Sequence, residues 1–184
     1  FILKINETFF HDQYILHVNR AVINSKKFLH PASIWHRDLP YQNFTTNDPV
    51  ALTFIHFINE NSKKNGGLKL LKNSHKWSAF PSDSYVLKNS ETPDIKEGSL
   101  LVFDSALFHT ASSNNLSTRR TLVTIFSSPL FKQQINLSKL VDLKKKNDYL
   151  KKIKNIKFIL GLTTNSSYSD DEYRNKKLKN SKSI

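Results

Sequence analysis

The 184-residue sequence contains no cysteine and no methionine. Without cysteine, the chain can form no disulfide and can offer no thiolate to a metal ion. It also lacks an apolar run of 18 residues and a signal-peptide pattern, which predicts a soluble, cytoplasmic protein with no membrane span. The absence of methionine even at position 1 indicates a sequence that begins inside a longer reading frame or was processed.

Acidic residues are few relative to basic ones, and the formal net charge is +13. Much of this charge lies in residues 139–184, where 13 Lys and Arg stand against five Asp and Glu. Segments rich in Lys, Asn and Ser of this kind tend to stay solvated or disordered. The charge is concentrated in this tail, and no recognised nucleic-acid module is visible. Both observations argue against nucleic acid as the main partner. A nucleic-acid binder with a basic tail is therefore our third hypothesis.

Short strands separated by polar turns predict a mainly β protein with one sizeable core, a sandwich or barrel. Hydrophobic residues make up 38% of the chain and include 13 Phe, enough for such a core. The predicted strands cover residues 13–23, 50–58, 67–72, 99–104 and 120–127. A helix with one apolar face is predicted at 138–160. We therefore predict a β core at 1–138, followed by a basic helix and a partly disordered tail at 139–184.

The motif His36-Arg37-Asp38 is the first sign of chemistry. In an extended segment alternate side chains share a face, so His36 and Asp38 would project together as two ligands for a divalent metal. His109, just past the predicted strand 99–104, is the candidate third ligand. Two histidines and one carboxylate with open positions form the facial triad of non-haem Fe(II) oxygenases. Because His-x-Asp also arises by chance, the prediction depends on the motifs around it.

Arg120 follows His109 by eleven residues, at the start of the next strand. A buried arginine needs an anionic partner, and its planar fork suits a carboxylate, so we predict that Arg120 anchors the distal carboxylate of a co-substrate. Arg119 would then face solvent; a solvated strand start is the alternative for both arginines. Thr53 places a hydroxyl on an otherwise apolar inward face. It either hydrogen-bonds the same carboxylate or packs in the sheet.

Several stretches, taken in order, carry a family resemblance. They are His36-x-Asp38, Gly66-Gly67 with Asn73-Ser74-His75-Lys76, Gly98-Ser99-Leu100-Leu101-Val102-Phe103, His109 and Arg120. Together they resemble the phytanoyl-CoA dioxygenase family over about residues 14–136. That family comprises Fe(II)- and 2-oxoglutarate-dependent oxygenases on a double-stranded β-helix, a jelly-roll fold of the cupin type. The order and spacing of the motifs make the resemblance specific, although each motif is weak alone.

The resemblance implies a role for each motif residue. His36, Asp38 and His109 would bind iron, and Arg120 would bind the C5 carboxylate of 2-oxoglutarate. Thr53 and Asn19 occupy strand positions where relatives place a hydroxyl or an amide near the co-substrate. No catalytic residue beyond the metal site is implied.

The function implied by this resemblance is that of an Fe(II)- and 2-oxoglutarate-dependent dioxygenase. It would use O2 to hydroxylate a small-molecule substrate and would release succinate and CO2. Family members usually carry a long helical region before the His-x-Asp motif, where this chain has 35 residues, so we expect an N-terminally incomplete core. A catalytically idle β-sandwich binding domain that retains the motif is the alternative. Neither the substrate nor the oligomeric state follows from these residues.

Overall fold

The chain divides into two compact units, Phe1–Ile135 and Asn136–Ile184. The computed structural model describes residues 1–25, 33–39, 44–112, 118–137, 150, 152–163 and 169–181. Within these ranges every strand belongs to the first unit. None of the helices in the described part of the chain combines the length and the apolar character needed to cross a lipid bilayer.

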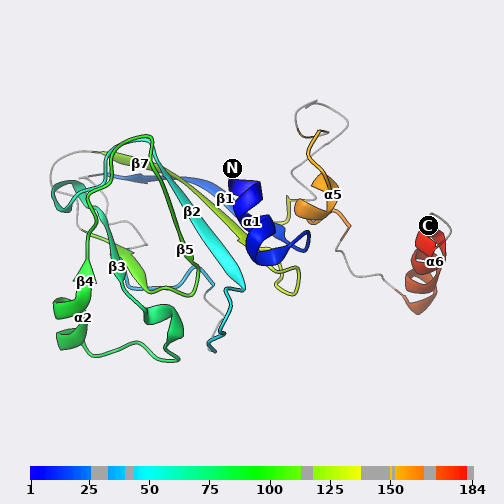
Figure 1. The fold of residues 1–184 in the computed structure, drawn as a ribbon, viewed down its shortest axis with the longest axis horizontal. Coiled ribbons are helices and arrows are strands. Elements are labelled where there is room, and N and C mark those ends of the chain that lie inside the picture. The colour runs from blue at the N-terminus through cyan, green and yellow to red at the C-terminus, as the bar shows by residue number, and fades with distance from the viewer. Residues whose placement is uncertain are drawn as a thin grey trace. The chain divides into compact units, whose positions relative to one another are not determined.

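Two antiparallel sheets form the first unit (Figure 1). The larger sheet has the strand order β1 (Ile15–Asn24), β7 (Arg119–Ser127), β2 (Ala51–Phe57) and β5 (Leu100–Asp104). The smaller sheet has the order β4 (Ser90–Glu91), β3 (Leu68–Leu71) and β6 (His109–Ala111). The prediction of a mainly β architecture is confirmed, and five of the seven strands coincide with predicted ones. The short strands β4 and β6 were not predicted.

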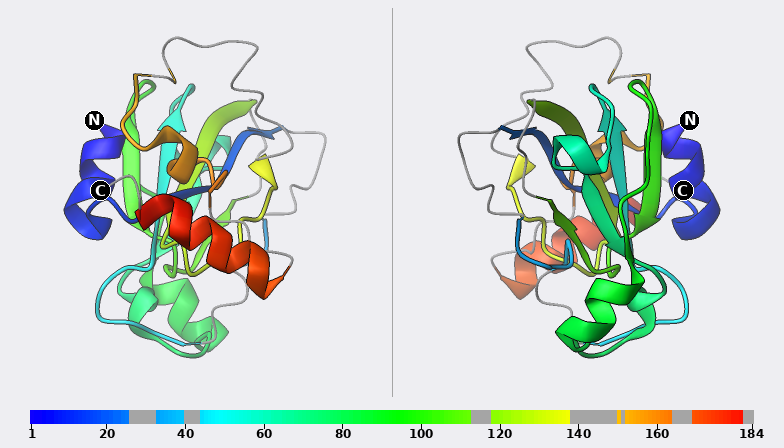
Figure 2. Two further views of the ribbon diagram at one scale, coloured as in Figure 1. Left: turned by 90° about the vertical axis from the view of Figure 1, so that its right-hand side faces the viewer. Right: turned by 90° about the vertical axis from the view of Figure 1, so that its left-hand side faces the viewer.

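Helices are few and lie outside the sheets. The first unit contains α1 (Ile2–Phe10), α2 (Asp83–Asn89) and the 3₁₀ turns η2 (Lys63–Asn65) and η3 (Ser74–Lys76). Both views in Figure 2 show α2 below the strands. No helix was predicted in this segment. Asp83 lies in the first turn of α2, where its negative charge interacts favourably with the positive end of the helix dipole.

The second unit contains α5 (Ile156–Ile159) and α6 (Asp170–Ser181). The predicted helix at 138–160 lies partly outside the described residues, which omit 138–149 and 151. Within that range Leu150 is helical, residues 152–155 form turns and a bend, and α5 begins at Ile156. Helix α6 was not predicted and lies in the segment expected to be partly disordered.

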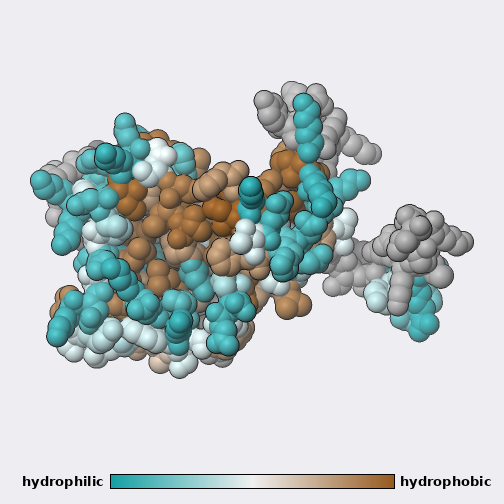
Figure 3. Space-filling model, in the orientation of Figure 1, coloured by the Kyte–Doolittle hydropathy of each residue, from teal (hydrophilic) through white to brown (hydrophobic). Residues whose placement is uncertain are grey.

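The core lies between the two sheets. Buried apolar side chains from β1, β2, β3 and β7 form it, together with Leu39: Val18, Ala51, Ile55, Phe57, Leu68, Val123 and Ile125. Strand β7 also carries apolar residues on its other face, where Phe126 packs edge-on against Tyr14 and Phe54. Figure 3 shows hydrophobic residues at the surface over the larger sheet. Both faces of β7 therefore carry apolar residues, so the apolar pattern does not show which of Arg119 and Arg120 faces the core.

Candidate metal centre

The His-x-Asp segment and strand β6 are paired directly. His36 and His109 form an isolated antiparallel bridge with two reciprocal backbone hydrogen bonds of 3.0 Å. The backbone N–H of Asp38 donates to the carbonyl of Ser105 at 3.0 Å, which continues the pairing. One potential ligand atom from each of His36, Asp38 and His109 lies within 4.8 Å of the other two. The structure thus brings together the three residues that we predicted as metal ligands.

Backbone carbonyls orient both imidazoles. Nδ1 of His36 lies 2.7 Å from the carbonyl oxygen of Ile34, and Nδ1 of His109 lies 3.0 Å from that of Leu107. A carbonyl only accepts, so each Nδ1 carries a proton and Nε2 is the nitrogen left to face a metal ion. Burial is the main cause that lowers the pKa of His109, and His36 and Arg20 lower it further, against Asp38 and the Leu107 carbonyl. The Nδ1 contacts therefore orient both rings with Nε2 available as the candidate ligand atom.

Two buried hydroxyls hold the carboxylate of Asp38. Thr53 Oγ1 donates to Asp38 Oδ2 at 2.6 Å and lies 2.8 Å from Ser105 Oγ. Thr53 has a single hydroxyl proton, so Ser105 donates to Thr53 and Thr53 donates to Asp38. We predicted that Thr53 either contacts a co-substrate or packs in the sheet, and in the structure its hydroxyl bonds Asp38. Thr53 orients the predicted metal ligand, because its only proton is already given to Asp38.

The turn at residues 73–76 forms hydrogen bonds to both segments that carry the predicted ligands, and we call this set of contacts the clamp. Ser74 Oγ accepts a hydrogen bond from the backbone N–H of Phe108 at 2.8 Å, and Ser74 is fully buried. Arg37 donates to the carbonyls of Ser74, at 3.2 Å, and of Trp77. The Arg37 guanidinium also lies 4.2 Å from the centre of the Phe108 ring. Since Arg37 and Phe108 neighbour the predicted ligands, this clamp fixes how the two segments face each other.

A pocket of about 500 Å³ opens beside the three predicted ligands. It is lined by residues of β1, β2, β3, β6 and β7 as well as the His-x-Asp segment: Arg20, Val22, Asn24, His36, Asp38, Ile55, Leu68, His109, Ala111, Arg119, Thr121 and Val123. This space is open to solvent, and its lining combines apolar side chains with polar and charged ones.

The prediction that Arg120 faces this pocket is wrong by one residue. Arg119 is 5% exposed and lines the pocket, whereas Arg120 is exposed on the outer face. Alternation along β7 places Arg119 on the same side as Val123 and Ile125, which pack in the core. Burial lowers the pKa of Arg119, and its Nε has no hydrogen-bond partner. Val123 and Ile125 alternate with Arg119 and could have indicated which arginine faces inward. Apolar residues on the other face of β7, such as Phe126, made the inward face ambiguous in the sequence.

Asn19 also faces away from the pocket, contrary to prediction. It is exposed, and its Oδ1 accepts a hydrogen bond from Thr124 Oγ1 at 3.2 Å. The pairing of β1 with β7 shifts register between Leu16 and Val18, and beyond this irregularity Arg20 and Asn24 line the pocket instead. Sequence reasoning missed Arg20 and Asn24, because nothing in the strand pattern marks a bulge at this position.

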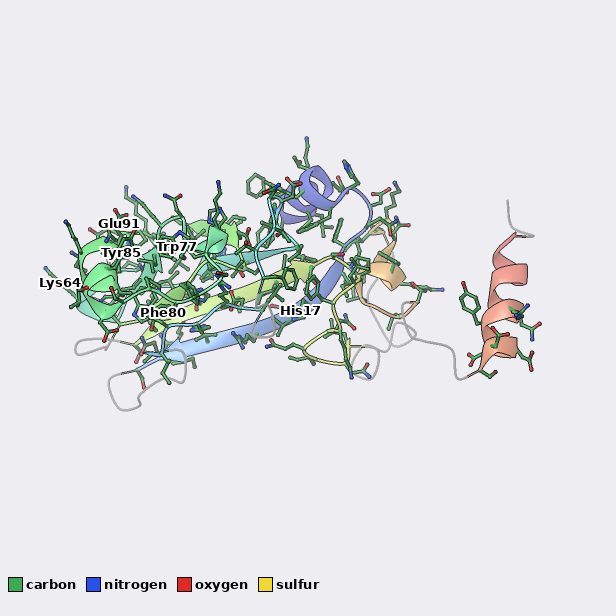
Figure 4. The ribbon with its side chains drawn as sticks, turned by 90° about the horizontal axis from the view of Figure 1, so that it is seen from below. His17, Lys64, Trp77, Phe80, Tyr85 and Glu91 are labelled. Carbon is green, nitrogen blue, oxygen red and sulfur yellow. The ribbon has the colours of Figure 1, made fainter. Side chains whose placement is uncertain are left out.

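His17 lies at this irregularity and is buried. Its Nδ1 is 3.4 Å from Ser127 Oγ on the paired strand. Burial lowers the pKa of His17, and the negative charge of Asp38 opposes this effect. Figure 4 shows His17 well apart from the aromatic side chains of Trp77, Phe80 and Tyr85. Pairing of β1 with β7 thus provides His17 with a partner, Ser127.

The antiparallel β core and its cluster of two histidines and one carboxylate define a class, the double-stranded β-helix with a facial-triad donor set. Comparison with protein families gives a match over residues 6–121 to the family described as phytanoyl-CoA dioxygenase (PhyH). The chain belongs to the phytanoyl-CoA dioxygenase family, as its motifs predicted.

Solved structures with the same fold include enzymes titled as non-heme monooxygenases. "Non-heme monooxygenase, ThoJ-Ni complex" is 15% identical, with a TM-score of 0.53, over 73% of this chain and 53% of that one. "Crystal Structure of EvdMO1" is 19% identical, with a TM-score of 0.56, over 70% of this chain and 30% of that one. These likenesses confirm the double-stranded β-helix fold. The chain spans about half or less of the length of these structures.

Proposed function

We propose that this chain is an Fe(II)- and 2-oxoglutarate-dependent dioxygenase that hydroxylates a small organic molecule and releases succinate and CO2. One observation carries the proposal. His36, Asp38 and His109 converge with free ligand atoms at the wall of a pocket that also contains a buried arginine, Arg119. A metal site and a carboxylate anchor in one pocket are the two features that such a co-substrate requires.

The donor set fits ferrous iron. His36 and His109 would bind through Nε2 and Asp38 through its carboxylate, an arrangement of three hard or borderline ligands that leaves further positions open. When bound, iron would supply O2 activation coupled to oxidative decarboxylation of the 2-oxo acid. The protein contributes two imidazoles oriented by the carbonyls of Ile34 and Leu107, and a carboxylate oriented by Thr53.

Arg119 would bind the distal carboxylate of 2-oxoglutarate, in place of the Arg120 that the sequence suggested. Its guanidinium is buried, and its Nε lacks a hydrogen-bond partner. A buried guanidinium with an unbonded Nε is unfavourable, so a bidentate carboxylate would relieve a cost that the folded chain already bears. Apolar walls such as Val22 and Ile55 exclude water and strengthen that ion pair.

Anaerobic titration with Fe(II) and 2-oxoglutarate tests the proposal, because the iron chelate of a 2-oxo acid has a visible charge-transfer band. We expect the band with the unaltered chain and its loss in His109→Ala. Absence of the band from a folded protein would contradict the proposal. Exposure of the complex to O2 then separates an enzyme from an idle binding domain, since only the enzyme forms succinate in an iron-dependent manner.

A further inference from the structure

Arg20 is the one charged residue of the pocket wall, among the described residues, to which the proposed chemistry gives no role. It lies on β1, and its Nη2 is 3.9 Å from Oδ1 of Asp38. Its side chain is 45% exposed, whereas that of Asp38 is 3% exposed. Solvent therefore reaches this guanidinium beside the metal cluster.

Arg20 and Arg119 lie at different levels of the pocket. Strand pairing sets Arg119 opposite Asn24, which is four residues beyond Arg20 on β1, and Arg20 opposite Val123. At about 3.3 Å per residue, the backbone positions of the two arginines are roughly 13 Å apart along the strand direction. One arginine is thus buried, and the other is accessible next to Asp38. This separation suits two different anionic groups.

The charge balance of the pocket leads to the same conclusion. Its charged wall residues in the described part of the chain are Arg20, Asp38 and Arg119, a net charge of +1 with neutral histidines. A divalent metal ion raises this to +3, and the 2-oxoglutarate dianion lowers it to +1. Once Asp38 ligates the metal, its charge no longer balances Arg20. Arg20, which solvent reaches, then has no anionic partner among the charged residues of the pocket wall that the structure describes.

We propose that Arg20 binds a carboxylate of the primary substrate and so determines specificity for small organic acids. This inference rests on the proposed function. A single carboxylate supplies the one negative charge that the pocket lacks, and the planar guanidinium matches it bidentately. Val22 and Val123, which line the same wall, offer an apolar surface to the hydrocarbon part of such an acid. Anchoring the acid at Arg20 would place its C–H bonds beside the metal cluster.

Fluorine NMR with trifluoroacetate as probe tests this role without depending on turnover. The full chain is loaded with Mn(II), a paramagnetic and redox-inert replacement for iron, and with saturating 2-oxoglutarate. Paramagnetic broadening of the trifluoroacetate resonance reports binding near the metal, and neutral trifluoroacetamide is the control ligand. We expect broadening of the anion alone. Arg20→Gln should weaken anion binding about tenfold or more, and Arg20→Lys should weaken it less.

Arg120→Gln is the matched control, because it removes an exposed arginine from the outer face of the sheet, and it should bind trifluoroacetate as the unaltered chain does. Equal binding by Arg20→Gln, or no binding by the unaltered chain, would overturn the proposal. So would an Arg20→Gln variant that loses the Fe(II)–2-oxoglutarate band, which would place Arg20 on the co-substrate. If the unaltered chain never forms that band, the proposed function fails separately; the trifluoroacetate titration without 2-oxoglutarate then still tests Arg20.

Discussion

Arg119 and Arg120 are adjacent in β7, but their side chains lie on opposite faces of the larger sheet. The first is buried in the pocket, and the second is exposed. Adjacent residues of a strand differ in this way because the side-chain direction alternates at every residue. The same substitution at the two positions therefore separates a role in the pocket from a general effect of charge.

Arg119→Gln should raise the Kd for 2-oxoglutarate at least tenfold, because it removes a charge-assisted pair in a water-poor pocket. Arg120→Gln should leave that Kd unchanged. Titration of 2-oxoglutarate into the Fe(II)-loaded protein, followed by the visible band, measures both. Equal affinity in the two variants would contradict the assignment of Arg119 as the anchor.

Thr53→Val tests the hydroxyl chain behind Asp38. The substitution preserves shape but removes the donor to Asp38 Oδ2 and the acceptor for Ser105. We expect a loss of about 1–3 kcal/mol in the free energy of unfolding, measured in urea. We also expect metal affinity, measured by anaerobic calorimetry, to fall about 10- to 100-fold.

Thr124→Val is the matched control for this substitution. Its hydroxyl bonds exposed Asn19 on the outer face of the same sheet, so the change in stability should stay within about 0.5 kcal/mol. If both variants bind metal like the unaltered chain, Thr53 packs in the sheet without orienting Asp38.

At the scale of elements, the η3 turn holds the segments that carry the predicted ligands. Strand β6 contains only His109–Ala111, too short to define its own position by strand pairing alone. Ser74 adds a bond to the backbone just before it, and Arg37 ties the turn to the His-x-Asp segment. The motif at residues 73–76, one of those that carried the family resemblance, thus has a structural role. Its buried Ser74 holds together the two segments that carry the predicted metal ligands.

Ser74→Ala should therefore lower the free energy of unfolding by about 1–3 kcal/mol, since it leaves the Phe108 N–H without its acceptor. Ser84→Ala, in the exposed part of α2, should change it by no more than about 0.5 kcal/mol. Urea unfolding of the two variants side by side gives the comparison. A similar effect in both would mean that the clamp contributes nothing to stability.

At the scale of the whole molecule, burial of His17 links folding to pH. The folded state holds the pKa of His17 below its ordinary value of 6.5. Below pH 6.5 the unfolded chain therefore binds more protons than the folded one, and acid favours unfolding. Stability contributed by neutral His17 is complete above that pH and is lost as the pH falls towards the folded-state pKa.

His17→Gln should accordingly reduce the slope of unfolding free energy against pH below 6.5, by up to about 1.4 kcal/mol per pH unit. Urea denaturation of the metal-free chain between pH 7 and pH 5 measures this slope. His11→Gln, which replaces an exposed histidine in the same unit, should keep the original slope. An unchanged slope in His17→Gln would exclude His17 as a source of acid sensitivity.

The sequence by itself determined the class of the protein. Alternating apolar residues and polar turns gave the mainly β architecture, and the order of the motifs gave the family. The period of an extended segment paired His36 with Asp38, and the order of the surrounding motifs added His109 to the predicted ligands. These conclusions depend on short-range patterns that a single chain displays directly.

Only the tertiary structure decided which neighbouring side chains face the pocket. A register change of one residue exchanges the two faces of a strand, and β7 is apolar on both, so Arg119 and Arg120 could not be distinguished beforehand. On β1, the register shift between Leu16 and Val18 likewise decides which side chains face the pocket. Arg20 and Asn24 face it, and Asn19 faces away. The orientation of Asp38 by Thr53 likewise depends on the packing of distant segments, which no local pattern contains.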